Sequence, residues 1–350
     1  MNNNTLERKI CINLDELVPG MIIAQTLSNQ YGATIIYDRT VLTPVLIHKL
    51  QNLSYDRIYV YDISEKEIDE NTNRFSVSYE QSQSMVKDML KDVGDGRPLD
   101  MQKVRSVSTL LMGRIDTSRD VIDAISQVRT TDEYTYTHCI NVSLICSLMG
   151  RWLKLDDISI KLLTYSGLLH DIGKSKISNS ILEKPGKLSE KEFEIIKKHP
   201  ALGYKILEKI PSLNKNVLMG VLMHHEREDG SGYPLGAKNQ QIHYFAKIVA
   251  LSDIYDAMTS DRVYHAKQSP FSVLEMFENN SFGLLEPRYI MVLLSNIANY
   301  YIGDLVRLSS DEVGEIIYIN PHHVSRPLVR IDNSYVDLYQ EPSLKIIELL

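Results

Sequence analysis

Residues 224–234 of the chain read HHEREDGSGYP. The two adjacent histidines follow a stretch with helical spacing of apolar residues, 217–223, and a glycine-containing loop comes directly after them. Gly230 and Gly232 permit a positive φ or the close approach of another backbone segment, so the loop is at least a tight structural turn. Histidines that lead from a helix into such a loop are candidates for a functional site, because loops held by rigid elements often carry function.

Further candidate ligands stand in other predicted helices or at their ends. They are His138, His170, Asp171, His199 and Asp253. We expect His199 to end the helix that a capping box of Ser189 and Glu192 opens. Imidazole and carboxylate groups suit first-row divalent metals, and a helical bundle can bring side chains from several helices to one point. Taken singly, a histidine is more simply a surface or capped residue, a role that we assign to His48, His243, His265, His322 and His323.

The chain divides into a helical centre and two flanking modules. Residues 80–300 show helical spacing almost throughout, whereas 1–63 is predicted to be a small α+β module and 301–350 a small β-rich one. The polar stretch 64–79 is predicted to be a linker. In the first module we expect strands at 10–14, 21–27, 34–37 and 58–61 and a helix at 45–50; in the last, strands at 305–308, 314–319, 327–331 and 335–338.

Composition narrows the class of protein. With 350 residues, 43% hydrophobic and 24% charged, the chain is long enough for two or three globular domains. The formal net charge of −7 argues against a broad basic surface for DNA, RNA or an anionic membrane, but an anionic small molecule needs only a local cation or metal. Three cysteines without a CxxC pair and no long apolar stretch predict a reduced, cytoplasmic location.

Together these motifs resemble the HD-GYP domain, a branch of the HD superfamily of metal-dependent phosphohydrolases. The matching pieces are YTYTH at 134–138, HDIGK at 170–174, HP at 199–200, the run at 224–234 and SDIYDAMTSDR at 252–262. The resemblance covers about 115–297. It implies a mainly α fold with a central HD-type helical bundle, 80–300. The first module loosely resembles a domain that often precedes HD-GYP domains, and the last module resembles none that we know.

The resemblance also implies a role for each motif residue. Two divalent metal ions per chain, iron or manganese, are expected, with Asp171 bridging them. The first metal would be bound by His138, His170, Asp171 and Asp253, and the second by His199, His224 and His225. Lys174 would be catalytic and contact the scissile phosphate, and Arg262 would bind substrate phosphate. The simpler alternative for Lys174 is a solvated loop lysine, and for Arg262 it is a helix-end cap or a partner for Asp261. Gly232, Tyr233 and Pro234 would shape the substrate pocket, and the 229–234 loop meets partner proteins in some relatives.

Two positions depart from the family pattern. A relative with three metals has a glutamate one helical turn before the first ligand histidine, where this chain has Tyr134. A neutral phenol is a poor ligand, since its pKa lies near 10. A second family position is often lysine or arginine and is His265 here. The first departure bears on the metal count, for which we predict two metals and not three, and the second bears on the binding of phosphate.

The resemblance implies a bacterial signalling enzyme that hydrolyses cyclic di-GMP to the linear dinucleotide, with GMP as a further product. One alternative is an enzyme for another cyclic dinucleotide. Another is a non-catalytic cyclic-dinucleotide sensor or interaction module, which has no need of all seven ligands. No nucleic-acid polymer or membrane is expected as a partner, and a homodimer is compatible with the sequence.

Overall fold

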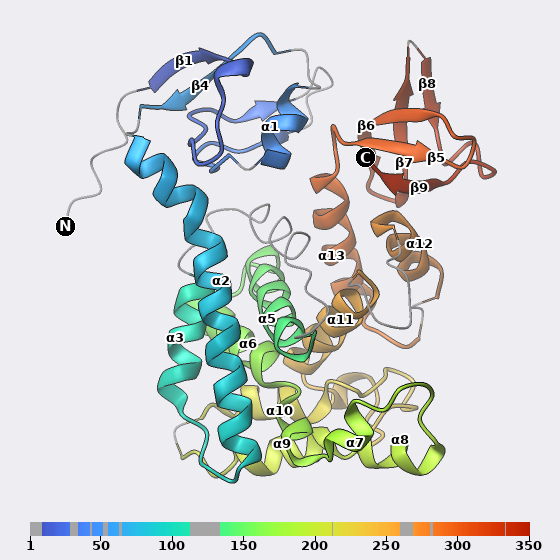
Figure 1. Ribbon diagram of the computed structural model, residues 1–350. Coiled ribbons are helices and arrows are strands. Elements are labelled where there is room, and N and C mark those ends of the chain that lie inside the picture. The colour runs from blue at the N-terminus through green and yellow to red at the C-terminus, as the bar shows by residue number, and fades with distance from the viewer. Residues whose placement is uncertain are drawn as a thin grey trace.

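The computed structural model describes residues 9–28, 34–42, 44–51, 55–62, 65–112, 134–211, 213–259, 269–280, 283–332 and 334–350. A body of helices carries two modules that contain strands, one from each end of the chain (Figure 1). This arrangement confirms the predicted mainly α fold. No helix among these residues combines the length and the apolar character needed to cross a membrane.

The first module contains two antiparallel strand pairs and one helix. Its elements are β1 (Lys9–Asn13), η1 (Leu14–Glu16), β2 (Leu27–Ser28), β3 (Thr34–Ile36), α1 (Pro44–Gln51) and β4 (Arg57–Tyr61). β1 pairs with β4, and β2 pairs with β3. The strand predicted at 21–27 is wrong for most of its length, because Ile22 and Ile23 make only isolated bridges. Ile23, Leu46 and Ile58 are fully buried and form part of a separate small core.

Most of the predicted linker, 64–79, is helical. α2 (Glu65–Gly94) is one continuous helix that runs from the first module along the helical body (Figure 1). Glutamate, lysine and glutamine have good helix propensity, so a polar composition does not exclude a helix. The segment that leaves the first module is therefore a helix that reaches the helical body.

The helical body surrounds α5 (Tyr134–Trp152). Every side chain from 137 to 150 is buried, and α5 packs against α2, α6, α11 and α13. Asp156 caps α6 by accepting a hydrogen bond from the Ser159 backbone N–H. The other helices are α3 (Met101–Met112), α6 (Asp157–Leu169), η3 (Ile172–Lys176), α7 (Asn179–Leu182), α8 (Glu190–Ile196), α9 (His199–Leu207), α10 (Lys215–Met223), η4 (Asn239–Gln241), α11 (Tyr244–Thr259), α12 (Pro270–Asn280) and α13 (Pro287–Tyr300).

His199 begins a helix and does not end one. The predicted capping box of Ser189 and Glu192 opens α8, but α8 ends at Ile196 and α9 starts at His199. Pro200 stands in the first turn of α9, where its missing N–H costs no hydrogen bond, so the chain re-enters a helix there. The expected end of the α8 helix at His199 was therefore wrong.

The last module is a five-stranded antiparallel sheet in the order β8-β7-β6-β5-β9. Its strands are β5 (Leu305–Leu308), β6 (Val313–Asn320), β7 (His323–Ile331), β8 (Ser334–Asp337) and β9 (Ile346–Leu349). The first four confirm the predicted strands, and β9 was missed. The buried Lys49 of α1 lies 2.8 Å from Asp304 Oδ1 and donates to the Tyr300 carbonyl at 2.9 Å. The first module is thus tied to the end of α13.

Candidate metal centre

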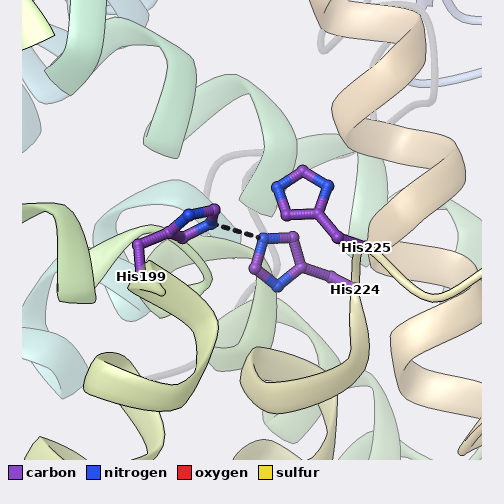
Figure 2. A group of neighbouring side chains, drawn as sticks. All are labelled: His199, His224 and His225. Carbon is purple, nitrogen blue, oxygen red and sulfur yellow. Dashed lines mark hydrogen bonds between the residues drawn. The ribbon is translucent and has the colours of Figure 1, made fainter. Parts of the chain in front are cut away.

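All seven predicted ligands lie together in the helical body. His138 lies in α5, His170 and Asp171 follow α6, His199 opens α9, His224 and His225 follow α10, and Asp253 lies in α11. Ligand atoms of His199, His224 and His225 lie within 4.8 Å of one another, as do those of His138, His170 and Asp171. Figure 2 shows the first group, with the rings of His199 and His224 turned toward each other. His138 Nε2 lies 3.1 Å from Asp253 Oδ1, which adds Asp253 to the second group.

Backbone carbonyls orient three of these histidines. In each, Nδ1 lies within hydrogen-bond distance of the carbonyl three residues earlier. The pairs are His170 with Gly167 (2.7 Å), His199 with Ile196 (2.8 Å) and His224 with Val221 (2.7 Å). Because a carbonyl can only accept, Nδ1 carries the proton and the Nε2 lone pair points into the centre. This tautomer is the one that binds a metal through Nε2.

The centre collects acceptor atoms that lack donors. His199 Nε2 lies 3.2 Å from His224 Nε2 and 3.2 Å from Asp171 Oδ1. Within the described part of the chain, the buried atoms His170 Nε2 and Asp171 Oδ1 have no hydrogen-bond partner. Burial holds the pKa of His224 well below its usual range, so His224 does not gain a proton that it could donate to the neighbouring acceptor atoms. A bound cation would satisfy all these atoms at once, and the residues therefore fit a divalent metal.

His138 is held by a carboxylate that the sequence analysis did not single out. Its Nδ1 donates to Asp256 Oδ2 at 2.7 Å, and Asp256 is fully buried. Burial alone would lower the pKa of His138, but hydrogen bonds to Asp253 and Asp256 outweigh it and raise that pKa to about 10. The available signal was the spacing, because residues three apart on a helix share a face. Asp253 therefore faces the centre directly, while Asp256 supports His138 from behind.

Lys174 lies at the edge of the centre. Its Nζ donates to Asp171 Oδ2 at 2.6 Å, and 31% of its side chain is exposed. The absence of a side chain at Gly173 allows Lys174 to take this place. A Cβ at residue 173 would lie 1.9 Å from the His199 carbonyl oxygen. η3 can approach α9 this closely only without a side chain at residue 173, and that approach brings Lys174 and His199 to the same carboxylate.

The 226–237 segment is anchored beneath the histidines. The buried Glu226, also missed from the sequence, accepts hydrogen bonds from the backbone N–H groups of Leu235 (2.6 Å) and Ala237 (2.9 Å). Gly230 has a φ of +83°, and a Cβ at Gly232 would lie 2.5 Å from the His225 carbonyl oxygen. The Tyr233 ring stacks on His225 with centroids 4.7 Å apart. The loop is therefore a tight turn whose aromatic side chain lies against a candidate ligand.

For three positions discussed in the sequence analysis, the structure does not describe the side chain. Arg262 and His265 lie outside the described residues. The structure places Tyr134 at the start of α5 but does not describe its side chain. The phosphate contact of Arg262 and the third-metal position beside His138 therefore remain predictions.

The part of the chain that contains the candidate ligands matches known proteins. A model of the HD-domain family matches residues 118–282. A cyclic di-GMP phosphodiesterase of Pseudomonas aeruginosa is 30% identical over 265 residues, which make up 75% of this chain and 64% of that protein. A 3′3′-cGAMP-specific phosphodiesterase of Vibrio cholerae is 35% identical over 160 residues, 46% of this chain and 35% of that protein. The chain thus spans less than two thirds of the length of these curated relatives.

A solved structure of an HD-GYP protein from Bdellovibrio bacteriovorus has a similar fold. It matches with a TM-score of 0.52 and 15% identity, and the match covers 83% of this chain and 99% of the other. This likeness supports the fold alone. The family match and the curated relatives confirm the resemblance inferred from the sequence. Residues 118–282 therefore match the HD-domain family, and this region contains all the motifs that resemble the HD-GYP branch.

Proposed function

We propose that this protein is a metal-dependent phosphodiesterase that hydrolyses cyclic di-GMP to the linear dinucleotide, with GMP as a further product. The observation that carries the proposal is the shared carboxylate of Asp171. It stands between the two ligand groups, 3.2 Å from His199 Nε2 on one side and 3.4 Å from His170 Nε2 on the other, and it binds Lys174. A buried anion between two sets of imidazoles, with an ammonium beside it, suits hydrolysis of a phosphate ester.

Two divalent ions, iron or manganese, would be held by the seven ligands, with Asp171 common to both. When bound, such a pair supplies a water of lowered pKa and neutralises charge on the phosphate. The chain's own contribution is to orient the imidazoles and to keep those of His224 and His225 neutral. Burial lowers the pKa of His225 to about 3, so this side chain keeps a free lone pair at neutral pH. Lys174 adds a positive charge that can reach a bound phosphate, because part of its side chain is exposed.

The 229–234 loop has two sides that suit two roles. Tyr233 faces inward against His225, where it would line the substrate pocket with Gly232. Asp229 and Ser231 are exposed and are available to a partner protein. We propose that the inner side contacts the nucleotide and the outer side a signalling partner.

The substrate is tested with a panel of cyclic dinucleotides. Protein purified without oxygen and loaded with Mn²⁺ or Fe²⁺ is given cyclic di-GMP, 3′3′-cGAMP and cyclic di-AMP, and products are separated by chromatography. We expect linear products, with cyclic di-GMP hydrolysed fastest. Preference for 3′3′-cGAMP would favour the second candidate, which rests on the likeness to the Vibrio cholerae enzyme. Tight binding without turnover by a fully loaded protein would indicate a sensor and overturn the proposal.

The number of metals is a separate prediction. Position 134, where a third-metal ligand would stand, is a tyrosine, and the described residues contain two ligand groups. We expect two metal ions per chain from elemental analysis of protein purified without oxygen. Anomalous diffraction that shows a fully occupied third ion beside His138 would contradict this count.

Removing the metals should destabilise the protein. Chelation leaves the buried lone pairs and carboxylates of the centre facing one another without a cation. A ligand present at about 100 times its dissociation constant stabilises the folded state by roughly 3 kcal/mol. We therefore expect a chelator to lower the melting temperature and an added divalent ion to restore it. An unchanged melting temperature after complete metal loss would show that the centre binds metal too weakly to matter for folding.

A further inference from the structure

A chain of buried hydrogen bonds leads from α2 to His138. The Tyr79 hydroxyl donates to Asn141 Oδ1 at 2.7 Å. Asn141 Nδ2 donates to Asp256 Oδ1 at 2.8 Å, and Asp256 Oδ2 accepts from His138 Nδ1 at 2.7 Å. Tyr79, Asn141 and Asp256 are each at most 1% exposed. The chain therefore crosses three helices, α2, α5 and α11, without contact with water.

The direction of each bond is set by chemistry. A carboxylate can only accept, so Asp256 requires a donor from both Asn141 and His138. Asn141 satisfies Asp256 only when its amide nitrogen points there, which turns its oxygen toward Tyr79. Burial, followed by the negative charge of Asp256, raises the pKa of Tyr79 above its ordinary value, so its hydroxyl keeps the proton that it donates. Each group thus fixes the orientation of the next.

We propose that Tyr79 is a positioning residue for the metal ligand His138, acting through Asn141 and Asp256. The proposal rests on the proposed role of His138 as a ligand. With Nδ1 bound to an oriented carboxylate, His138 directs Nε2 into the centre, where Asp253 Oδ1 lies 3.1 Å away. Groups of this kind behind a metal-binding histidine change metal affinity by roughly 10- to 100-fold. The residue that orients the ligand comes from the helix that leaves the first module.

α2 also offers a matched control. Gln83, one turn after Tyr79, donates to Thr137 Oγ1 at 2.9 Å. Thr137 precedes His138 in α5, so Gln83 secures the same helix pair at the same height but is not part of the chain of bonds. Loss of Gln83 weakens the docking of α2, whereas loss of the Tyr79 hydroxyl removes the first member of the chain and leaves the ring in place.

The test measures Mn²⁺ affinity by competition with a chelator, on the full chain. We expect Tyr79→Phe to weaken one of the two Mn²⁺ sites by about 10-fold and to leave the other unchanged. Gln83→Ala should leave both affinities as in the wild type. Asp256→Asn, which puts an amide donor against Asn141 or His138, should weaken the same site by roughly 100-fold and serves as the test if Tyr79→Phe does not fold.

Two results would overturn the proposal: unchanged Mn²⁺ affinities in Tyr79→Phe, or an equal loss in Tyr79→Phe and Gln83→Ala, which would show a general effect of helix docking. The readout does not require hydrolysis. A wild-type protein that binds two Mn²⁺ ions but cleaves no cyclic dinucleotide would refute the proposed function and still allow this test. A wild-type protein that binds no Mn²⁺ would refute both.

Discussion

Asp171→Ala is expected to abolish hydrolysis and to release most of the bound metal. Asp171 is 3% exposed and lies within 3.7 Å of three candidate ligands, His138, His170 and His199. Among the described carboxylates, Asp171 alone lies within 4.0 Å of a histidine of each ligand group. Removing a ligand common to both ions opens both coordination shells, so we expect metal content and turnover to fall together. Elemental analysis and product chromatography on the same preparation measure the two quantities.

Asp157→Ala is a suitable control for this substitution. Asp157 is exposed at the start of α6, the helix that ends beside Asp171. Its loss removes a favourable charge at a helix N-terminus, an effect of about 0.3–1 kcal/mol, and should leave metal content and turnover unchanged. Near-normal turnover with full metal content in Asp171→Ala would show that the centre is wrongly assigned.

Lys174→Ala is expected to lower turnover by roughly 100-fold or more while metal content and melting temperature stay close to the wild type. This is the scale of losing one charged contact to a transition state. The Asp171 carboxylate outweighs burial and raises the pKa of Lys174, so the ammonium is charged at neutral pH. The ion pair between Lys174 and Asp171 should contribute little to stability, because a bound metal would satisfy the same carboxylate.

Lys176 provides the comparison within the same short helix. Its Nζ donates to the backbone carbonyls of Val93 and Gly94 at the end of α2, away from the ligands. Lys176→Ala should therefore lower stability slightly and keep turnover. Loss of metal in Lys174→Ala, or equal losses of turnover in the two variants, would assign Lys174 a structural role.

Much of the centre was predictable because its signals are local. Ligand residue types, their places at helix ends and the turn-forming glycines depend on a few neighbours in the chain. Errors arose where a local signal had two readings. The polar stretch 64–79 was predicted to be a linker without a helix, yet its residues also favour a helix, and α2 begins at Glu65. At His199 the helical spacing of the apolar residues did not reveal the break between α8 and α9. β9 was missed because a short apolar end carries no strand-specific pattern.

The sequence alone was enough to infer the family resemblance, the helical centre and the seven candidate ligands, since each depends on residue type and short-range spacing. Tertiary structure alone decided which groups support them. Asp256 lies 118 positions from His138, and Tyr79 lies 62 positions from Asn141, yet each pair is joined by a hydrogen bond of 2.7 Å. Such a bond depends on the packing of α2, α5 and α11 to within a fraction of an ångström, and no spacing along the chain encodes that distance. Helix periodicity selects the face of a side chain, and packing selects its partner.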